Sequence, residues 1–383
     1  MTSKLHKKKI DAHLEADIYS RKNKKHLVLG KTPSDTSITL QSNDYLAITG
    51  HQHIRQKHLK AITDHKHEVV MSAVFQHQAE SGDTFEEQLA ALTGFEKCVL
   101  SQSGWAANVG LIQTLIPQGT PIYIDFFAHM SLWDGAKRAE GNIQTFLHNN
   151  MRHLEKQIKR EGPGLIMVDS VYSTIGTVAP LHDLVEIANR YGCALLVDES
   201  HSLGTHGKNG AGLVAELGLT DQVDFLTASL AKAFAYRAGA ILCSKDVAKS
   251  FPFTAYPAIF SSALLNHELE ILKATLDVIK DADDKRSQLF IQSEKLRSGL
   301  VNLGYKIKSQ SQIIALESGN DEDTEVIRDY LESRDVFGSV FCSPATPKNK
   351  NVIRFSLNSD VSDEQISTLL TVCREMREEL SLK

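Results

Sequence analysis

The sequence predicts an α/β fold, in which a mostly parallel central sheet is flanked by helices and followed by a smaller C-terminal α+β domain. Apolar runs alternate with helical patterns between about residues 46 and 260, as is typical of a parallel sheet buried on both faces. Beyond about residue 304, short strands are combined with two helices. The runs expected in the central sheet are KCVLS (97–101), PIYID (121–125), GLIMVDS (164–170), CALLVDE (193–199), DFLTAS (224–229) and GAILCS (239–244).

The predicted elements fall into four regions. Residues 1–45 are mixed and charged, and we expect a helix and an extended lead-in there; residues 46–260 form the large domain. Within that domain, Pro180 begins and Gly192 ends one clear helix, PLHDLVEIANRYG. A long connecting helix is expected over 261–303. The small α+β domain is expected over 304–383, with strands at 312–317, 337–341 and 352–357.

Composition argues against several classes of partner. The chain has 383 residues, 42% of them apolar, and a formal net charge of −5, so electrostatics favour neither nucleic acid nor an anionic membrane. No apolar run approaches the roughly 20 residues of a membrane span, and no apolar signal segment follows the basic N-terminus MTSKLHKKKI. Five scattered cysteines favour free thiols in a reducing compartment. We therefore expect a cytoplasmic protein.

Six of the sixteen histidines lie close together in the sequence. A metal site would need a ligand pattern such as HExxH or paired Cys and His, and neither occurs. We interpret the cluster as a solvated helical face and expect no metal centre. Its members are His51, His53, His58, His65, His67 and His77.

Polar residues follow four of the predicted strands at the point where each strand ends. Carboxyl ends of parallel strands meet at one edge of a sheet, where ligands gather, so we expect these residues to converge. Taken singly, each has a structural explanation: Asp caps helices, Ser-Gly forms strand-to-helix turns, and histidines are often structural. The residues are Ser103, Gly104, Trp105, His129, Asp198, His201, Ser229 and Lys232.

Together, these residues fit one ligand, pyridoxal 5′-phosphate (PLP). The amine of Lys232, placed among small and apolar neighbours, forms a Schiff base with the aldehyde. The carboxylate of Asp198 holds the pyridine nitrogen protonated. Backbone N–H groups at 103–105, where a helix begins, and the hydroxyl of Ser229 suit the phosphate. The imidazole of His129 stacks on the ring.

The chain resembles the α-oxoamine synthases of the PLP-dependent fold-type I group over nearly its full length. Within that family it is most similar to the synthases of α-hydroxyketone quorum-sensing autoinducers. The stretches that carry the resemblance are SNDYLA (42–47), SQSGWAANVGLIQ (101–113), DFFAHMS (125–131), VDSVYSTIGTVAPL (168–181), VDESHSLGTHGKNGAG (197–212), TASLAKAFAYRAGA (227–240), IFSS (259–262) and NVIRFSLNSDVSDEQI (351–366).

The resemblance implies a role for each matching residue. Lys232 is the Schiff-base lysine and proton shuttle, Asp198 pairs with the ring nitrogen, His201 with the phenolic oxygen, and His129 stacks on the ring. Residues expected to hold the phosphate are Ser103, Gly104, Trp105 and Ser229, joined by Ser261 and Ser262 of the other subunit. That sharing implies a homodimer. Residues expected near the ring oxygen or the substrate are Ser173, Asn43, Arg354 and Thr346; Asn43 and Arg354 bind the amino-acid carboxylate.

Three segments depart from the family pattern. The glycine-rich stretch is replaced by VVMSAVFQHQAESGDTFEEQLA (69–90), Ser-Met-Asp-Gly by STIG (173–176), and a doubled glycine by YRAG (236–239). These segments belong to the expected substrate side. An apolar lining there suits an aliphatic acyl chain, since burial is worth about 0.8 kcal/mol per CH₂.

The resemblance implies that an amino acid, S-adenosylmethionine or one like 2-aminobutyrate, is condensed with a medium-chain acyl-CoA and decarboxylated to an α-amino ketone. The nearest alternative is a glycine- or alanine-using synthase of the 8-amino-7-oxononanoate, 5-aminolevulinate or 2-amino-3-ketobutyrate type. A different class is suggested by SLAK (229–232), the S-x-x-K of serine β-lactamases, but its companion motifs occur in the wrong order, as SND (42–44) and GKTP (30–33). A non-catalytic scaffold is the third alternative.

Overall fold

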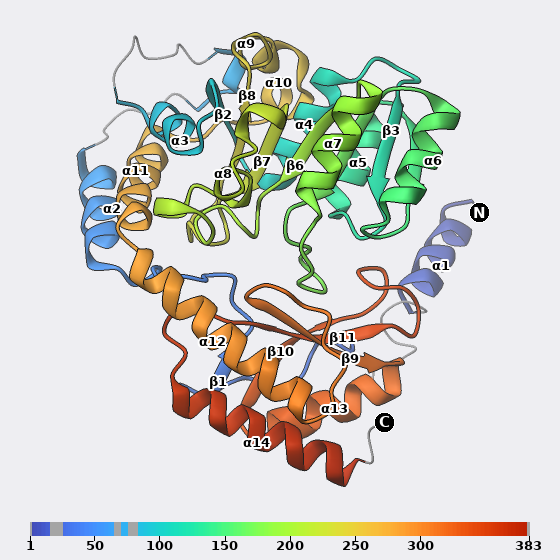
Figure 1. Cartoon of the computed structure of the whole chain (residues 1–383), viewed down its shortest axis with the longest axis vertical. Helices are drawn as coiled ribbons and strands as arrows, with labels where there is room; N and C mark the ends of the chain where they lie inside the picture. The colour runs from blue at the N-terminus through green and yellow to red at the C-terminus, as the bar shows by residue number, and fades with distance from the viewer. Residues whose placement is uncertain (1, 16–25, 65–69, 76–82, 381–383) are drawn as a thin grey trace.

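The computed structural model describes residues 2–15, 26–64, 70–75 and 83–380. These residues form two sheets, each covered by helices (Figure 1). The larger sheet has the strand order β2-β8-β7-β6-β5-β3-β4, and the smaller has the order β1-β10-β11-β9. The α/β fold class is as predicted.

The large sheet is parallel except for β8, which pairs antiparallel with both β2 and β7. The carboxyl ends of its six other strands therefore lie at one edge. Its strands are β2 (Lys97–Ser101), β3 (Pro121–Asp125), β4 (Asn142–Phe146), β5 (Leu165–Asp169), β6 (Ala194–Asp198), β7 (Phe225–Ser229) and β8 (Gly239–Cys243).

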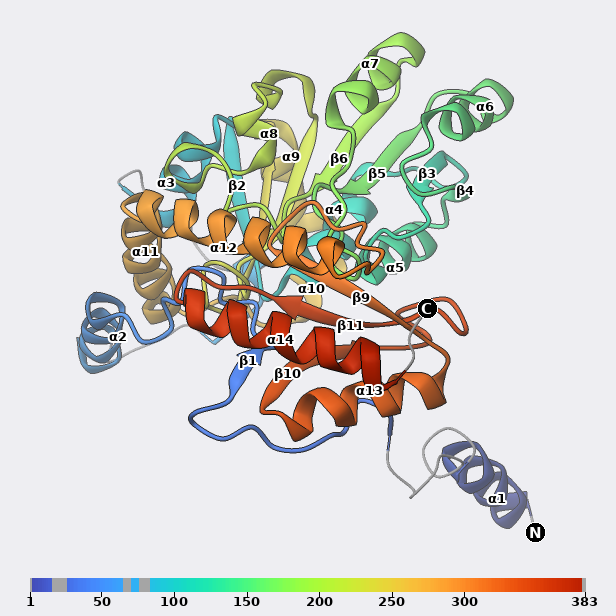
Figure 2. The same cartoon turned by 60° about the horizontal axis from the view of Figure 1, so that its bottom comes forward.

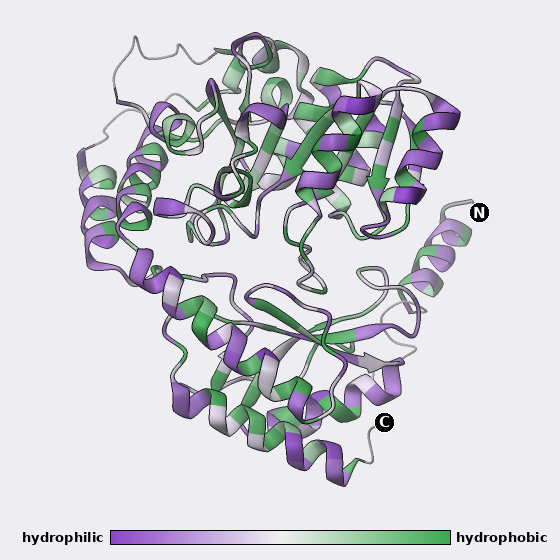
Figure 3. Ribbon diagram, in the orientation of Figure 1, coloured by the Kyte–Doolittle hydropathy of each residue, from purple (hydrophilic) through white to green (hydrophobic). Residues whose placement is uncertain are grey.

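Alternate residues of the strands pack against helices on opposite faces. Ile122 and Ile124 of β3 face one apolar cluster with α4 and α5, whereas Tyr123 faces another with α6, α7 and α11 (Asn266–Lys280). Figure 3 shows the resulting pattern, with hydrophobic central strands and hydrophilic outer helix faces. Besides α11, the helices of the large domain between residues 85 and 260 are α3 (Phe85–Thr93), α4 (Gly104–Leu115), α5 (Met130–Arg138), α6 (Met151–Glu161), α7 (Leu181–Tyr191), α8 (Leu213–Glu216), α9 (Lys245–Thr254) and α10 (Tyr256–Phe260).

The small sheet includes a strand from the N-terminal part of the chain. β1 (Ile38–Leu40) pairs in parallel with β10 (Val336–Phe341), which pairs antiparallel with β11 (Asn351–Ser356) and through it with β9 (Ile313–Gly319). Helices α12 (Asp283–Asn302), α13 (Asp321–Ser333) and α14 (Asp363–Glu379) cover it, and α12 and α14 lie side by side (Figure 2). The N-terminal segment 1–45 thus contributes to the small domain.

The stretch 261–303, expected as one long helix, contains two. α11 (Asn266–Lys280) ends at Asp281, and α12 begins at Asp283. α11 packs on α2 (Gln52–Asp64) and on the large-domain core, whereas α12 belongs to the core of the small domain. The break therefore marks where the chain passes from one domain to the other.

Three further expectations concern local structure. The helix α7 begins after Pro180 and ends before Gly192, as predicted. Strand β4 was not predicted, because its sequence NIQTF is more than half polar and only its last residue, Phe146, is fully buried. At the N-terminus, α1 (Thr2–Leu14) is the expected helix, and residues 26–37 before β1 form turns and irregular backbone.

The five cysteines and the clustered histidines lie in different surroundings. All five cysteines are buried free thiols. His51, His53 and His58 lie on or beside α2, whereas His65, His67 and His77 lie outside the described residues. Within the described part of the chain, no group of three His, Cys, Asp or Glu side chains is arranged to hold a metal ion. In the same residues, no helix is both long and apolar enough to cross a membrane.

Candidate active site

The carboxyl edge of the large sheet faces the small sheet (Figure 1), and Lys232 and His201 of the large domain lie within electrostatic reach of Arg354 of the small sheet. Asp198 ends β6, Ser229 ends β7, and Ser103 follows β2 as the N-cap of α4, where its hydroxyl accepts from the N–H of Ala106 at 3.1 Å. The convergence expected from the strand ends is therefore present.

Gly104 begins α4 directly against the end of β7. A Cβ atom at Gly104 would lie 2.6 Å from the Cβ of Ser229, so no larger residue fits without displacement. The first N–H groups of a helix have no acceptor within the helix and attract anions. The N–H groups of Gly104 and Trp105 and the hydroxyl of Ser229 thus form a cradle suited to a phosphate. The indole of Trp105 is half exposed and donates to Asp134 at 3.1 Å.

Asp198 is a buried carboxylate with two hydrogen-bond donors. Its Oδ1 accepts from the backbone N–H of Ser200 at 2.8 Å, and its Oδ2 accepts from the Asn108 side chain at 2.7 Å. Asp198 is only 4% exposed, and Asn108 only 1%. A buried carboxylate whose hydrogen-bond partners are neutral N–H groups is suited to hold a cationic ring nitrogen.

His129 is the N-cap residue of α5; part of its side chain is exposed, although protein atoms surround most of its ring. Its backbone N–H donates to Asp169 at 3.1 Å, and its Nδ1 lies 2.7 Å from the hydroxyl of Ser131. Its ring makes an edge contact with Trp105. Burial lowers the pKa of His129, and Lys232 lowers it further against the opposing effect of Asp198. A neutral imidazole face is therefore available beside the cradle.

Lys232 lies in the turn after β7. Burial lowers the pKa of its amine, as does the nearby guanidinium of Arg354, while Asp198 opposes both. A lowered pKa leaves more of the amine unprotonated at neutral pH, which is the nucleophilic form. The amine is therefore prepared to attack a carbonyl group.

His201 connects the large domain to the N-terminal segment. Its Nδ1 lies 2.6 Å from the hydroxyl of Tyr45, and both side chains are buried. Burial lowers the pKa of His201 well below its ordinary value, and the charges of Lys232 and Arg354 add to this. Burial also raises the pKa of Tyr45, so both groups stay neutral.

Arg354 is a buried cation on β11 and 4% exposed. Its guanidinium donates to Asn43 Oδ1 at 2.9 Å and to the backbone carbonyl of Ser173 at 2.8 Å, and it stacks 4.7 Å from the Phe341 ring. Its Nε is buried without a hydrogen-bond partner in the described residues. Neutral partners alone do not compensate a buried charge. The arrangement therefore fits an incoming carboxylate.

The remaining predicted residues lie apart from this cluster. Ser261 and Ser262 are exposed; Ser261 donates to the carbonyl of Pro257, and the carbonyl of Ser262 accepts from Gln102 at 2.6 Å. The hydroxyl of Thr346 is 3.4 Å from Asn351 Oδ1, at the far end of β11 from Arg354. Their expected roles stay predictions.

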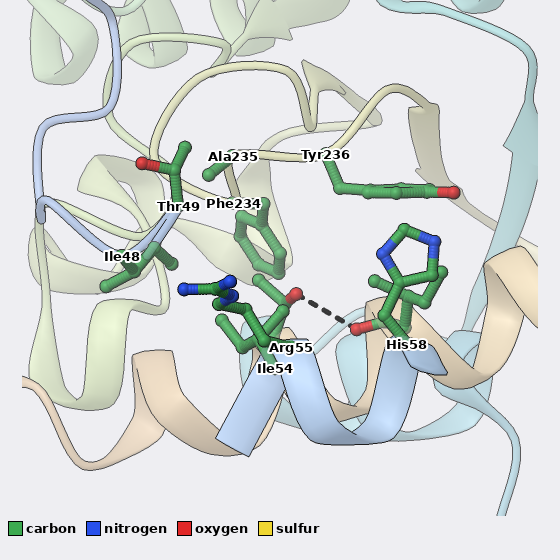
Figure 4. A pocket seen from close by; sticks show the side chains of 10 residues that line it. Ile48, Thr49, Ile54, Arg55, His58, Phe234, Ala235 and Tyr236 are labelled. Carbon is green, nitrogen blue, oxygen red and sulfur yellow. Dashed lines mark hydrogen bonds between the residues drawn. The ribbon is translucent and has the colours of Figure 1, made fainter. Parts of the chain in front are cut away.

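A separate hollow of about 240 Å³ lies behind the lysine turn, between α2 and α11. Figure 4 shows Arg55 and His58 of α2 beside Phe234 and Tyr236, which follow Lys232 in the chain. None of the predicted site residues lines it. The chemistry belongs to the cluster at the sheet edge and not to this hollow.

The cluster fits PLP on structural grounds. A glycine-only cradle at the N-terminus of α4 suits the phosphate, a buried carboxylate suits the ring nitrogen, and an amine of lowered pKa suits the aldehyde. These three features come from Gly104, Asp198 and Lys232, residues that the sequence motifs singled out.

The chain belongs to the family described as aminotransferase class I and II, whose profile matches residues 35–372. This family is PLP-dependent, which confirms the predicted cofactor. Among its relatives is the CAI-1 autoinducer synthase of Vibrio campbellii, 56% identical over 367 residues, covering 96% of this chain and 93% of the relative. The predicted resemblance is thereby confirmed.

More distant proteins share the fold. The 8-amino-7-oxononanoate synthase of Coprothermobacter proteolyticus is 28% identical, over 86% of this chain and 85% of its own. Among solved structures, a serine palmitoyltransferase from S. paucimobilis with a bound PLP–myriocin aldimine superposes with a TM-score of 0.85 at 24% identity. That match covers 90% of this chain and 88% of the other.

Two side chains of the site were not predicted from the sequence. Asn108 lies in an apolar helical stretch, and Tyr45 in the motif SNDYLA; each contacts a predicted residue from another element. Asparagine at a buried position of an apolar helix is unusual, since it needs partners. A lone asparagine within an apolar helical stretch is therefore the one sequence signal that could have identified Asn108.

Proposed function

We propose that this chain is a PLP-dependent acyltransferase that condenses an amino acid with a medium-chain acyl-CoA to an α-amino ketone, releasing CoA and CO₂. The product is the precursor of a quorum-sensing autoinducer. The amino donor is S-adenosylmethionine or a short aliphatic amino acid such as 2-aminobutyrate. The observation that carries the proposal is the 56% identity to the CAI-1 autoinducer synthase over nearly the whole chain.

When bound, PLP supplies an aldehyde for amines and a ring that stabilises negative charge at the substrate α-carbon. Asp198 holds the ring nitrogen in its protonated form, and the N–H groups of Gly104 and Trp105 with Ser229 hold the phosphate. Burial of Lys232 and the charge of Arg354 lower the pKa of its amine, which favours the unprotonated form that could accept the α-proton. His129 would cover one face of the ring, and His201 would hydrogen bond its phenolic oxygen.

Arg354 and Asn43 bind the carboxylate of the amino acid. The guanidinium is already fixed by Asn43 Oδ1 and the Ser173 carbonyl. Orientation costs little when the binding group is already in place. Ser173 contributes its backbone carbonyl, which accepts from Arg354 at 2.8 Å, whereas Thr346 bonds Asn351 instead and its role near the substrate rests on the resemblance alone.

The alternative is a synthase that uses glycine or alanine, and the 28% identical 8-amino-7-oxononanoate synthase supports it only weakly. The experiment that separates the two is mass spectrometry of the product formed by purified enzyme from mixed acyl-CoAs with S-adenosylmethionine, 2-aminobutyrate, glycine and alanine in competition. An amino ketone built from S-adenosylmethionine or 2-aminobutyrate supports the proposal. A product built from glycine or alanine overturns it.

We further infer that two copies assemble and share their sites through Ser261 and Ser262. Support comes from aromatic side chains exposed on α9 and α10 directly before these serines: Phe253 is 66%, Tyr256 61% and Phe260 78% exposed. Large exposed apolar groups in one place mark contact surfaces. Light scattering of the Phe260→Glu variant against wild type tests the inference, and an unchanged molar mass that matches one chain in both contradicts it.

A further inference from the structure

Asn108 connects two elements of the site that are otherwise separate. Its amide nitrogen lies 2.7 Å from Asp198 Oδ2 and 2.8 Å from the hydroxyl of Ser131, and its amide oxygen lies 2.6 Å from the hydroxyl of Thr227. Asn108, Ser131 and Thr227 are all at most 1% exposed. Three of the four hydrogen bonds open to a primary amide are thus made, with partners on α5, β6 and β7.

Only one orientation of these groups satisfies every contact. An ionised carboxylate accepts but does not donate, so the amide nitrogen of Asn108 must face Asp198. The amide oxygen then faces Thr227, whose hydroxyl donates to it. The second N–H of the amide donates to the hydroxyl of Ser131. That hydroxyl has one proton, which is left for its other neighbour.

The other neighbour is Nδ1 of His129, 2.7 Å from the Ser131 hydroxyl. The backbone N–H of Ser131 also points at the same Nδ1, at 3.3 Å. A ring nitrogen that receives two donors carries no proton. His129 is therefore neutral with its proton on Nε2, in agreement with the lowering of its pKa by burial.

We propose that Asn108 and Ser131 are positioning residues that link Asp198 to His129 through a directed chain of hydrogen bonds. Because Asn108 donates to Asp198 and to Ser131, the hydroxyl of Ser131 must donate to His129, and this holds the ring-stacking imidazole neutral as its Nε2–H tautomer. The inference rests on the proposed roles of Asp198 and His129 toward the cofactor. A cationic ring nitrogen lies against Asp198 in that scheme. A cationic imidazole stacked on the same ring would repel it, and this chain of hydrogen bonds opposes such a charge.

The direct test is NMR of PLP-loaded enzyme with ¹⁵N-labelled histidine rings, with the His129→Gln variant to assign the signals. The proposal predicts that His129 is the Nε2–H tautomer at pH 7. A protonated ring or an Nδ1–H tautomer overturns it. This readout needs no turnover, so it is independent of whether the proposed reaction is correct.

Two variants test this chain of hydrogen bonds. Ser131→Ala removes one donor to the unprotonated Nδ1, so the pKa of His129 should rise by about 1. Asn108→Ala should also raise this pKa, because the hydroxyl of Ser131 is then free to accept from a protonated ring. It should also change the pH at which the visible absorbance of bound PLP titrates and lower kcat about tenfold, with KM for both substrates nearly unchanged.

The control is Thr114→Val, on the same helix, which removes a hydroxyl that bonds Thr254 at 2.8 Å and not the site. Melting temperatures measure any general loss of stability in the variants. If Asn108→Ala is folded and its His129 titrates as in wild type, Asn108 is merely structural and the proposal fails. If Asn108→Ala does not fold, Ser131→Ala and the wild-type tautomer decide the question.

Discussion

The Cα of Gly104 and the backbone of Ser229 are packed so closely that a methyl group on Gly104 would lie 2.9 Å from the Cα of Ser229. The start of α4 and the end of β7 are thereby held at a fixed spacing, because backbone atoms cannot give way as flexible side chains do. The N–H groups and the hydroxyl proposed to hold a phosphate owe their geometry to this contact.

Gly104→Ala should therefore weaken the binding of PLP by about tenfold or more, since α4 must move away from Ser229. Fluorescence titration of apoenzyme with PLP measures the dissociation constant. Gly50→Ala is the matched control, because no atom lies within 4 Å of its added Cβ position. Equal affinity in Gly104→Ala and Gly50→Ala would show that the phosphate is held elsewhere.

Lys232→Ala should abolish covalent attachment of PLP and lower kcat by roughly 10³-fold, because the α-proton loses its acceptor. Borohydride reduction of the native enzyme followed by peptide mass spectrometry should find the adduct on Lys232. Lys60→Ala is the control, since Lys60 is an exposed partner of Asp64 on α2. An adduct that persists in Lys232→Ala would refute the assignment.

Arg354→Lys should raise KM for the amino acid about tenfold and leave KM for the acyl-CoA nearly unchanged. Lysine keeps the charge but cannot reach Asn43, the Ser173 carbonyl and a carboxylate together. Steady-state kinetics with each substrate varied in turn separate the two constants. Arg334→Lys serves as the control, because Arg334 pairs with Glu379 on α14 away from the site. Equal effects on both KM values would rule out a carboxylate role for Arg354.

Glu199, directly after Asp198, should make stability depend on pH. Its side chain is fully buried, with Oε1 accepting from the N–H of Val214 at 2.6 Å. Burial raises its pKa from 4.5 to about 8. Between these values the folded state keeps a proton that the unfolded state has lost, so stability falls as pH rises from 4.5 to about 8.

Glu199→Gln removes this titration. The melting temperature of the variant minus that of wild type should therefore be larger at pH 8.5 than at pH 5. Differential scanning calorimetry at both pH values measures the two differences, with Glu270→Gln, at an exposed position of α11, as the control. A constant difference at both pH values would mean that Glu199 is ionised in the folded protein throughout.

Most strands of the large sheet could be predicted from the sequence, because strands that are buried on both faces consist almost entirely of apolar residues. Runs such as LIMVD in β5 are apolar at every position, and each of these positions is buried. Motif chemistry predicted Asp198, Lys232 and Arg354 for a related reason, since charged groups in apolar surroundings require a partner or a use. The structure brings both Asp198 and Arg354 within electrostatic reach of Lys232.

Side chains that act through other side chains were beyond the sequence. No local sequence pattern places Asn108 of α4 beside Asp198, ninety positions away, or Tyr45 beside His201. Strand β1 was missed for a similar reason: three residues carry no periodicity, and their pairing with β10 joins parts of the chain almost three hundred residues apart. Such contacts follow from topology and not from local pattern.

The short strand β1 also bears on which amino acids fit. It attaches the segment that carries Asn43 to the small sheet, where Asn43 bonds Arg354, while Lys232 stays with the large sheet. Under the roles proposed for Arg354, Asn43 and Lys232, the carboxylate and the reacting carbon of a substrate would be bound by different domains, so the spacing between these residues would select substrates by length. A β-amino acid inserts one more carbon, about 1.5 Å of bond length, between the two bound groups. It should therefore place the wrong atom at the amine of Lys232.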